Sequence, residues 1–165
     1  MKQHKRILAI GGTAVLGGLA ALAAVAVALA TPSSGFSTEQ LSLGRFGEIR
    51  IHTDDVKLKT KGDSDVYVVR NTVQPGGQSG WHYHPGPSLV TVVQGTATFY
   101  DGDDPTCTPE VFEVGTGVID DSVDADHVHL LRNEGTVPLI TVTFQIVSAG
   151  APRRVDAPDS GTCDS

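Results

Sequence analysis

The chain has 165 residues, of which 39% are hydrophobic, with 12 basic and 19 acidic side chains. Residues 1–30 hold three of the cations and no acid, so the remaining 135 residues carry a net charge of −10. A body of this length supports one domain rather than two. Its acidity argues against nucleic acid as a partner and against adhesion to an anionic membrane surface, because both need clustered lysine and arginine.

The first 30 residues have the pattern of an export segment. Residues 1–6 are cationic, residues 7–30 contain no charged side chain, and Ala28 and Ala30 place small residues at the end. This order is typical of a secretory signal peptide. A retained N-terminal membrane anchor is the alternative, since about 20 apolar residues span a bilayer. Both interpretations predict an extracytoplasmic body, secreted or anchored, that meets the membrane only through this segment.

Beyond residue 30 the sequence divides into three parts. Residues 31–40 include a Pro-, Ser- and Gly-rich stretch and are interpreted as a linker, and residues 151–165 as an irregular C-terminal tail. Residues 41–150 contain short β-branched and aromatic segments separated by turn residues, without helical periodicity, which predicts an all-β sandwich or barrel. The expected strands are residues 45–51, 66–73, 89–94, 96–100, 110–114, 128–133 and 139–147.

Two sets of residues in this region are expected to lie in opposite environments, one in the barrel interior and one in solvent. Apolar side chains expected to fill the barrel are Val90, Val92, Phe99, Phe144 and Ile146. Four aspartates that stand just before residue 127 are Asp120, Asp121, Asp124 and Asp126. These acids lack the ligand spacing of a calcium loop, so we interpret them as a solvated turn.

Two cysteines fit an oxidising compartment. Cys107 lies in the turn-rich segment Asp-Pro-Thr-Cys-Thr-Pro, and Cys163 is the third residue from the end. Neither has the Cys-x-x-Cys spacing of a metal or redox motif. In an extracytoplasmic protein we expect them to form a disulfide that ties the tail to the barrel, and two unpaired thiols are the alternative.

Four of the histidines form two His-x-His pairs, His82-Tyr83-His84 and His127-Val128-His129. On a β-strand, residues i and i+2 point to the same face, so each pair can present two imidazoles to one side of a sheet. Imidazole is a common ligand for divalent transition metals. The two pairs therefore predict a metal site inside the barrel, and ordinary surface or core histidines are the alternative.

The first pair lies in a longer pattern. Residues 76–95 follow G-x5-H-x-H-x3-S-x6-G, which resembles the first conserved motif of the cupin superfamily. His129 and Asn133 are similar to the H-x3-N core of the second cupin motif, although its usual upstream Pro and Gly positions fall on Asp124 and Asp126. The resemblance covers residues 60–148.

This resemblance implies a small jelly-roll β-barrel with a divalent metal (Fe, Zn, Ni, Cu or Mn) held by His82, His84 and His129. The family's fourth ligand is a glutamate at a position that is Ser88 here. Water, His127 or Asp126 could complete the set, and we expect three histidines plus water with His127 as the candidate fourth ligand. Ser88 is a candidate for contact with a substrate.

Replacing a ligand carboxylate by a neutral group raises the net charge at the metal by one unit. This change should strengthen Lewis acidity, and an all-nitrogen site suits Zn, Ni, Cu or Fe better than Mn.

Two classes of function fit these features. One is a metal-dependent enzyme, a dioxygenase or an isomerase, that acts on a small molecule. The other is a non-catalytic small-ligand-binding barrel, with or without metal. The partners expected are a small molecule and a second copy of the chain, and the fold alone does not identify the substrate.

Overall fold

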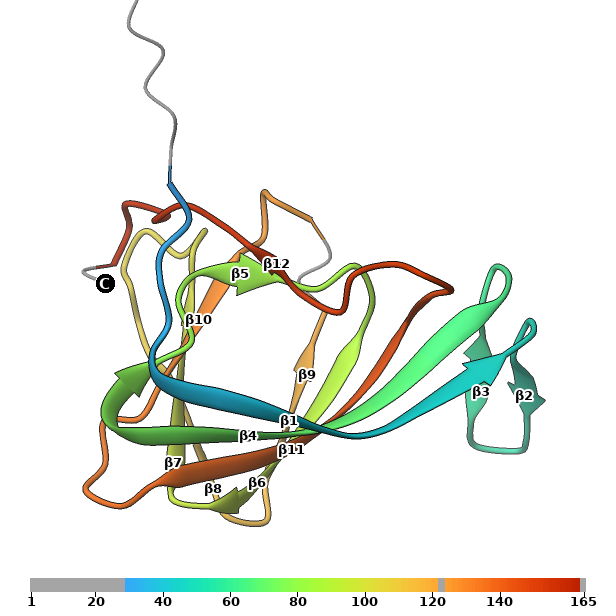
Figure 1. Ribbon diagram of the computed structural model, residues 1–165, viewed down its shortest axis with the longest axis horizontal. Helices are drawn as coiled ribbons and strands as arrows, with labels where there is room; N and C mark the ends of the chain where they lie inside the picture. The colour runs from blue at the N-terminus through green and yellow to red at the C-terminus, as the bar shows by residue number, and fades with distance from the viewer. Residues whose placement is uncertain (1–28, 122–123, 164–165) are drawn as a thin grey trace, which may run out of the picture.

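The computed structural model describes residues 29–121 and 124–163 (Figure 1). Every regular element in that part of the chain is a β-strand, as the sequence predicts. The export segment predicted for residues 1–30 lies, except for its last two residues, outside the described residues. Within the described ranges, the chain forms no helix with the length and apolar character to cross a membrane.

Twelve strands are assigned in the described ranges. They are β1 (Ser34–Phe46), β2 (Arg50–His52), β3 (Lys57–Lys59), β4 (Ser64–Gln78), β5 (His82–Tyr83), β6 (Ser88–Gln94), β7 (Thr96–Asp101), β8 (Glu110–Glu113), β9 (Gly117–Asp120), β10 (His129–Arg132), β11 (Leu139–Ser148) and β12 (Val155–Asp156).

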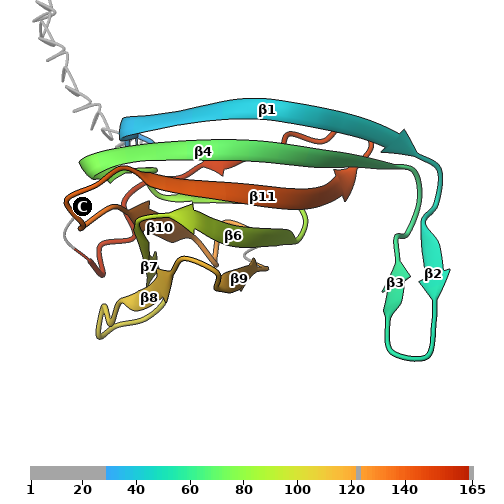
Figure 2. The same ribbon diagram turned by 90° about the horizontal axis from the view of Figure 1, so that it is seen from below.

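Ten of these strands form one sheet that curls into a two-layered barrel (Figures 1 and 2). One layer has the order β1-β4-β11-β6-β9 and the other the order β12-β5-β10-β7-β8. The layers are joined where Gln78 of β4 pairs with Arg132 of β10. This is the small jelly-roll barrel that the sequence predicts. The hairpin β2–β3 projects from the end of the ribbon formed by β1 and β4 (Figure 2).

Six of the seven predicted strands correspond closely to β4, β6, β7, β8, β10 and β11. The predicted strand 45–51 is divided between β1 and β2, because the chain turns after Phe46. The predicted linker 31–40 also differs, since its residues from Ser34 onward belong to β1 and pair with β4. The short strands β3, β5, β9 and β12 were not predicted.

The turn between β6 and β7 requires glycine. Gly95 has a φ of +76°, in the left-handed region that side chains other than glycine rarely adopt. A Cβ at this position would lie 3.0 Å from Leu139 Cα and 3.0 Å from Pro138 O. The turn and the close approach of β11 both therefore depend on the absence of a side chain.

Strand β11 turns its polar side chains inward. Thr141, Thr143 and Gln145 are buried, between Leu139 and Val147 on the same face. Phe144 is 38% exposed, so the prediction that it fills the barrel is wrong. Alternation along the strand places the threonines and the glutamine on the same inner face as Leu139 and Val147. Val90 and Val92 of β6 are buried as predicted.

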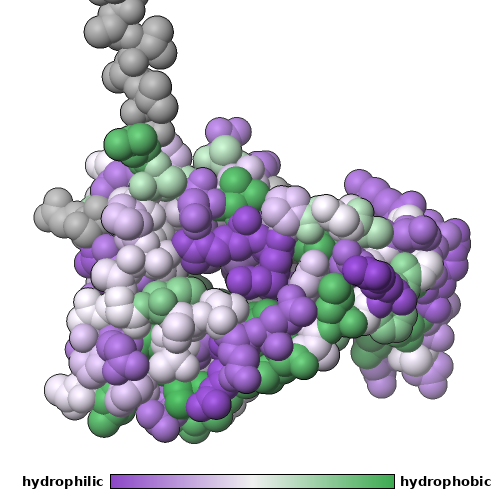
Figure 3. Space-filling model, viewed as in Figure 1, coloured by the Kyte–Doolittle hydropathy of each residue, from purple (hydrophilic) through white to green (hydrophobic). Residues whose placement is uncertain are grey.

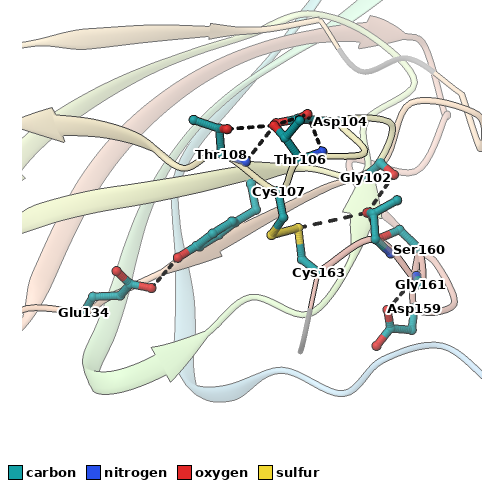
Figure 4. The surroundings of a disulfide bond; sticks show 12 residues. Gly102, Asp104, Thr106, Cys107, Thr108, Glu134, Asp159, Ser160, Gly161 and Cys163 are labelled. Carbon is teal, nitrogen blue, oxygen red and sulfur yellow. Dashed lines mark hydrogen bonds between the residues drawn. A yellow bond between two sulfur atoms is a disulfide. The ribbon is translucent and has the colours of Figure 1, made fainter.

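The C-terminal tail packs on the outside of the β5–β10 layer. Val155 and Asp156 pair with β5, and Ala157 is buried against Trp81 and Leu130. The structure joins Cys107 and Cys163 in the predicted disulfide (Figure 4). Residues 151–163 are thus a covalently fixed part of the barrel wall rather than an irregular extension.

Candidate metal centre

Three of the predicted histidines meet inside the barrel. His82 lies on β5, His84 follows that strand directly, and His129 begins β10 and pairs with His82 across the ladder. All three are buried, and their ligand nitrogens lie within 4.8 Å of one another. The Nε2 atoms of His82 and His129 are 3.1 Å apart.

The chain around His84 explains why it shares a face with His82. Pro85 follows His84, and the residue before a proline is restricted to an extended backbone. The i, i+2 alternation therefore continues one residue past the end of β5. The chain then bends at Gly86, where a Cβ would lie 2.1 Å from Ile146 O and could not be accommodated.

Backbone carbonyls fix two of the imidazole rings. His82 Nδ1 lies 2.9 Å from Gly80 O, and His84 Nδ1 lies 2.8 Å from Arg153 O. With the proton on Nδ1, each ring donates to its carbonyl and directs its Nε2 lone pair into the barrel. His84 Nδ1 also lies 3.0 Å from Gln145 Nε2. Histidines that bind metals are commonly oriented by such bonds.

Burial keeps His82 and His129 uncharged. It lowers the pKa of His82, with the neighbouring His129 as the next cause, and lowers the pKa of His129 to about 4. A metal ligand must be the neutral ring, so both side chains are in the form that binds near pH 7. Nδ1 of His129 is buried without a hydrogen-bond partner among the described residues.

His127 is not brought to this cluster. It lies in a turn, where its backbone N–H bonds to Asp124 O and its Nδ1 is 2.9 Å from Asp124 Oδ1. Its side chain is 59% exposed, and the Asp124 hydrogen bond raises its pKa. The prediction that it shares a strand face with His129 does not hold, because β10 begins only at His129. Asp126 is also exposed.

A buried carboxylate, which the sequence did not predict at this site, lies beside the histidine cluster. Asp120 ends β9, and its Oδ2 lies 3.2 Å from His84 Nε2 and 3.3 Å from His129 Nε2. Its side chain is only 5% exposed, so the expectation of a solvated turn fails for this residue and holds for the exposed Asp121, Asp124 and Asp126. Within β9, Ile119 is exposed, and the alternation along the strand turns Asp120 to the same face as Val118.

Ser88 lies directly opposite Asp120 in the β6–β9 ladder and opposite Gln145 in the β6–β11 ladder. It is fully buried, and its hydroxyl accepts a hydrogen bond from Gln145 Nε2 at 2.9 Å. Asp120, Ser88 and Gln145 therefore form one row across the inner face of the sheet.

The donor set fits a divalent transition metal. Ligand atoms around a tetrahedral ion with bonds of about 2.0–2.1 Å lie about 3.3–3.4 Å apart. The 3.1 Å between the Nε2 atoms of His82 and His129 is close to this separation. Imidazole nitrogens are also ligands that such ions prefer, and two of the three rings have their second nitrogen anchored to the backbone.

Two cavities meet at the histidines, and the face seen in Figure 3 is hollowed near its centre. The inner cavity, of about 40 Å³, is lined by the three histidines, by β11 threonines and by Arg153 and Arg154. The outer cavity, of about 400 Å³, is lined by several acids, among them Asp101 and Glu110. Phe99, Asp120 and His129 border both, so the outer cavity is the roomier approach to the histidines.

The two arginines are held in place around the inner cavity. Arg153 Nη1 donates to Gln145 Oε1 at 3.2 Å, and burial lowers the pKa of Arg153. Arg154 donates to Ser79 O at 2.5 Å and to Asp156 Oδ1 at 2.6 Å. The histidines therefore lie between a basic inner rim and an acidic outer one.

Comparison with known proteins supports the fold. Residues 69–145 match the family model of the cupin domain. No curated protein matches the chain. Among solved structures, the polyketide cyclase RemF from Streptomyces resistomycificus aligns with a TM-score of 0.50 and 15% identity over 74% of this chain and 72% of that one. At this identity the likeness shows the fold alone.

Two further structures are longer than this chain. The DMSP lyases RdDddP and RnDddQII give a match with a TM-score of 0.45 and 21% identity, over 55% of this chain and 43% of that one. A cupin 2 conserved barrel domain protein from Leptotrichia buccalis gives a TM-score of 0.44 and 14% identity, over 67% of this chain and 40% of that one. The chain thus spans less than half the length of these two proteins.

Proposed function

We propose that this chain is an exported cupin-type protein that binds a divalent transition metal through His82, His84 and His129 and acts on a small molecule beside it. The match of residues 69–145 to the cupin domain model supports this proposal. The observation that carries the proposal is the convergence of three buried imidazoles whose Nε2 atoms point to one place. Two of these rings are fixed there by backbone carbonyls.

When bound, such a metal supplies Lewis acidity to an oxygen or nitrogen of the small molecule. The chain's own residues would set its surroundings. Gly80 O and Arg153 O orient two of the imidazoles, Phe99 contributes an apolar surface to the cavity, and the buried threonines Thr141 and Thr143 offer hydroxyls. The inner cavity of about 40 Å³ has room for only a few atoms, so a larger substrate would extend into the outer cavity.

Export is supported by the sequence pattern of residues 1–30 and by the disulfide. Disulfides persist in oxidising compartments and are rare in the reducing cytosol. The Cys107–Cys163 bond joins residues 56 apart and closes the tail over the barrel. Cell fractionation and mass measurement of the mature N-terminus would test export and decide between cleavage and a retained anchor.

Metal analysis of the purified full chain tests the main proposal. We expect about one equivalent of metal in the unmodified chain after saturation and less than 0.1 equivalent in the double variant His82→Ala/His84→Ala. Failure of the unmodified chain to retain any transition metal would overturn the proposal. If metal binds, oxygen uptake and product analysis with phenols, thiols and keto acids separate an enzyme from a binding protein.

A further inference from the structure

The histidine cluster has a fourth polar neighbour that meets the requirements of a ligand. Oδ2 of Asp120 lies 3.2 Å from His84 Nε2 and 3.3 Å from His129 Nε2. Adjacent ligands of a tetrahedral ion are separated by about 3.3–3.4 Å. One carboxylate oxygen therefore stands at ligand spacing from two of the three imidazoles.

The Asp120 carboxylate and the two imidazoles that it contacts are all buried. The Asp120 side chain is 5% exposed, and the His84 and His129 side chains that it contacts are 8% and 7% exposed. Carboxylates with so little exposure are commonly found paired or bound to a metal, and Asp120 already contacts two of the imidazoles. A divalent ion among the imidazoles would lie within reach of the same carboxylate oxygen.

The strand register explains how the carboxylate reaches the cluster. Asp120 pairs directly with Ser88, and directly opposed residues in an antiparallel ladder point to the same face with Cβ atoms about 4.5–5.5 Å apart. Two adjacent positions of one sheet can therefore deliver a side chain to the same part of the barrel. The position on β6 holds a small hydroxyl here, and the position on β9 holds the acid.

We propose that Asp120 is the fourth ligand of the metal, supplied by β9 in place of a carboxylate at position 88. This inference rests on the proposed metal site formed by His82, His84 and His129. The ligand set is then three neutral imidazoles and one carboxylate, which reduces the net charge at a divalent ion from +2 to +1. The expectation of an all-nitrogen site completed by water or by His127 is thereby replaced.

Cobalt titration of the full chain tests this assignment, because the visible spectrum of Co²⁺ reports its ligands independently of any activity. The Asp120→Asn variant keeps the shape of the side chain and removes its charge. We expect its affinity for Co²⁺ to fall at least about tenfold, with a changed spectrum. Asp121→Asn, which removes one charge from the exposed neighbouring residue, should bind as the unmodified chain does.

Moving the carboxylate from position 120 on β9 to position 88 on β6 should restore metal affinity. In the double variant Ser88→Glu/Asp120→Ser, the acid stands on β6 and the hydroxyl on β9. We expect Co²⁺ affinity to return to within about fivefold of the unmodified chain, and Asp120→Ser alone to remain weak. Urea unfolding without metal checks the fold, and a single cooperative transition in Asp120→Asn would show that any loss of affinity is not a loss of folding.

The outcomes separate the two proposals. If the unmodified chain binds no metal, the proposed function fails. If it binds metal and Asp120→Asn binds equally well with the same spectrum, only the assignment of Asp120 fails. A crystal structure of the unmodified chain with Co²⁺ decides independently of the variants: an Oδ2-to-metal distance of about 2.0–2.2 Å supports the assignment, and one above about 3 Å overturns it.

Discussion

The two His-x-His segments have the same pattern and different structures. His82 and His84 both point into the barrel, whereas in the second segment His129 points inward and His127 lies in an exposed turn. The difference arises from the neighbouring residues. Pro85 keeps the backbone extended at His84, and Asp124 closes a turn onto His127 before the strand begins. Alternation thus predicts a shared face only where the chain is extended through both residues.

The segments also differ in what supports them from outside. The first is held by the tail, since β12 pairs with β5 and Arg153 O accepts the His84 Nδ1–H. The second begins a strand between β5 and β7, so His129 is placed by pairing on both sides. The following predictions test these differences, from the largest expected effect to the smallest.

Removing the disulfide should have the largest effect. In the variant Cys107→Ser/Cys163→Ser, we expect the free energy of unfolding to fall by about 4 kcal/mol, because a loop of 56 residues no longer restricts the unfolded chain. Urea unfolding measures the loss. A reductant added to the unmodified chain should reproduce it and leave the variant unchanged. A loss below about 1 kcal/mol would contradict a structural role for the tail's attachment.

Alanine substitutions at His129 and His127 should have very different effects on metal affinity. We expect His129→Ala to weaken Zn²⁺ binding at least about a hundredfold, because it removes a buried imidazole of the cluster. His127→Ala should change the affinity less than about twofold, since its ring is exposed and bonded to Asp124. Calorimetric titration measures both, and equal losses in the two variants would remove the distinction.

Pro85→Ala should weaken the first pair without removing a ligand. The substitution lifts the restriction on the backbone of His84, and we expect about fivefold weaker Zn²⁺ binding, equal to about 1 kcal/mol. Pro87→Ala is the matched control, because Pro87 follows Gly86 and not a histidine. The account of the first pair is wrong if both substitutions have the same effect.

The smallest effect concerns the titration of His127. The Asp124 hydrogen bond raises its pKa above 6.5, so the interaction is fully present below the pKa of the unfolded chain and is lost as pH rises through the folded value. Asp124→Asn should lower the His127 pKa in an NMR titration. Asp103→Asn should lower it less, because Asp103 Oδ2 is 3.9 Å from the ring. An unchanged pKa in Asp124→Asn would contradict the turn.

Much of the barrel was predictable because its long strands have β-branched residues bounded by glycine and proline. Strand β9 was not predicted, because it has only two apolar residues between a glycine and an aspartate, and an aspartate at such a place is usually solvated. Phe144 of β11 was predicted to face the barrel interior and faces outward, because both faces of that strand contain β-branched residues and the pattern does not distinguish them. The buried face is the one with Leu139, Thr141, Thr143, Gln145 and Val147, although the opposite face has more apolar residues.

The sequence predicted those residues of the candidate site that lie close together along the chain. His82, His84 and His129 follow from spacing within two short motifs. Asp120 does not, because its proximity to His84 comes from the pairing of β9 with β6. The carbonyl that orients His84 is equally remote, since Arg153 is 69 residues away along the chain. Spacing alone cannot show contacts made through such long-range pairing.

The position of Arg153 has a consequence for the order of assembly. Synthesis proceeds from the N-terminus, so both histidine pairs leave the ribosome before the residue whose carbonyl orients His84 and before Cys163 can reach Cys107. A nascent chain that stops short of its last fifteen residues therefore has the three histidines without the bond that aims one of them. The geometry of the centre is completed only when the finished chain closes its tail over the barrel.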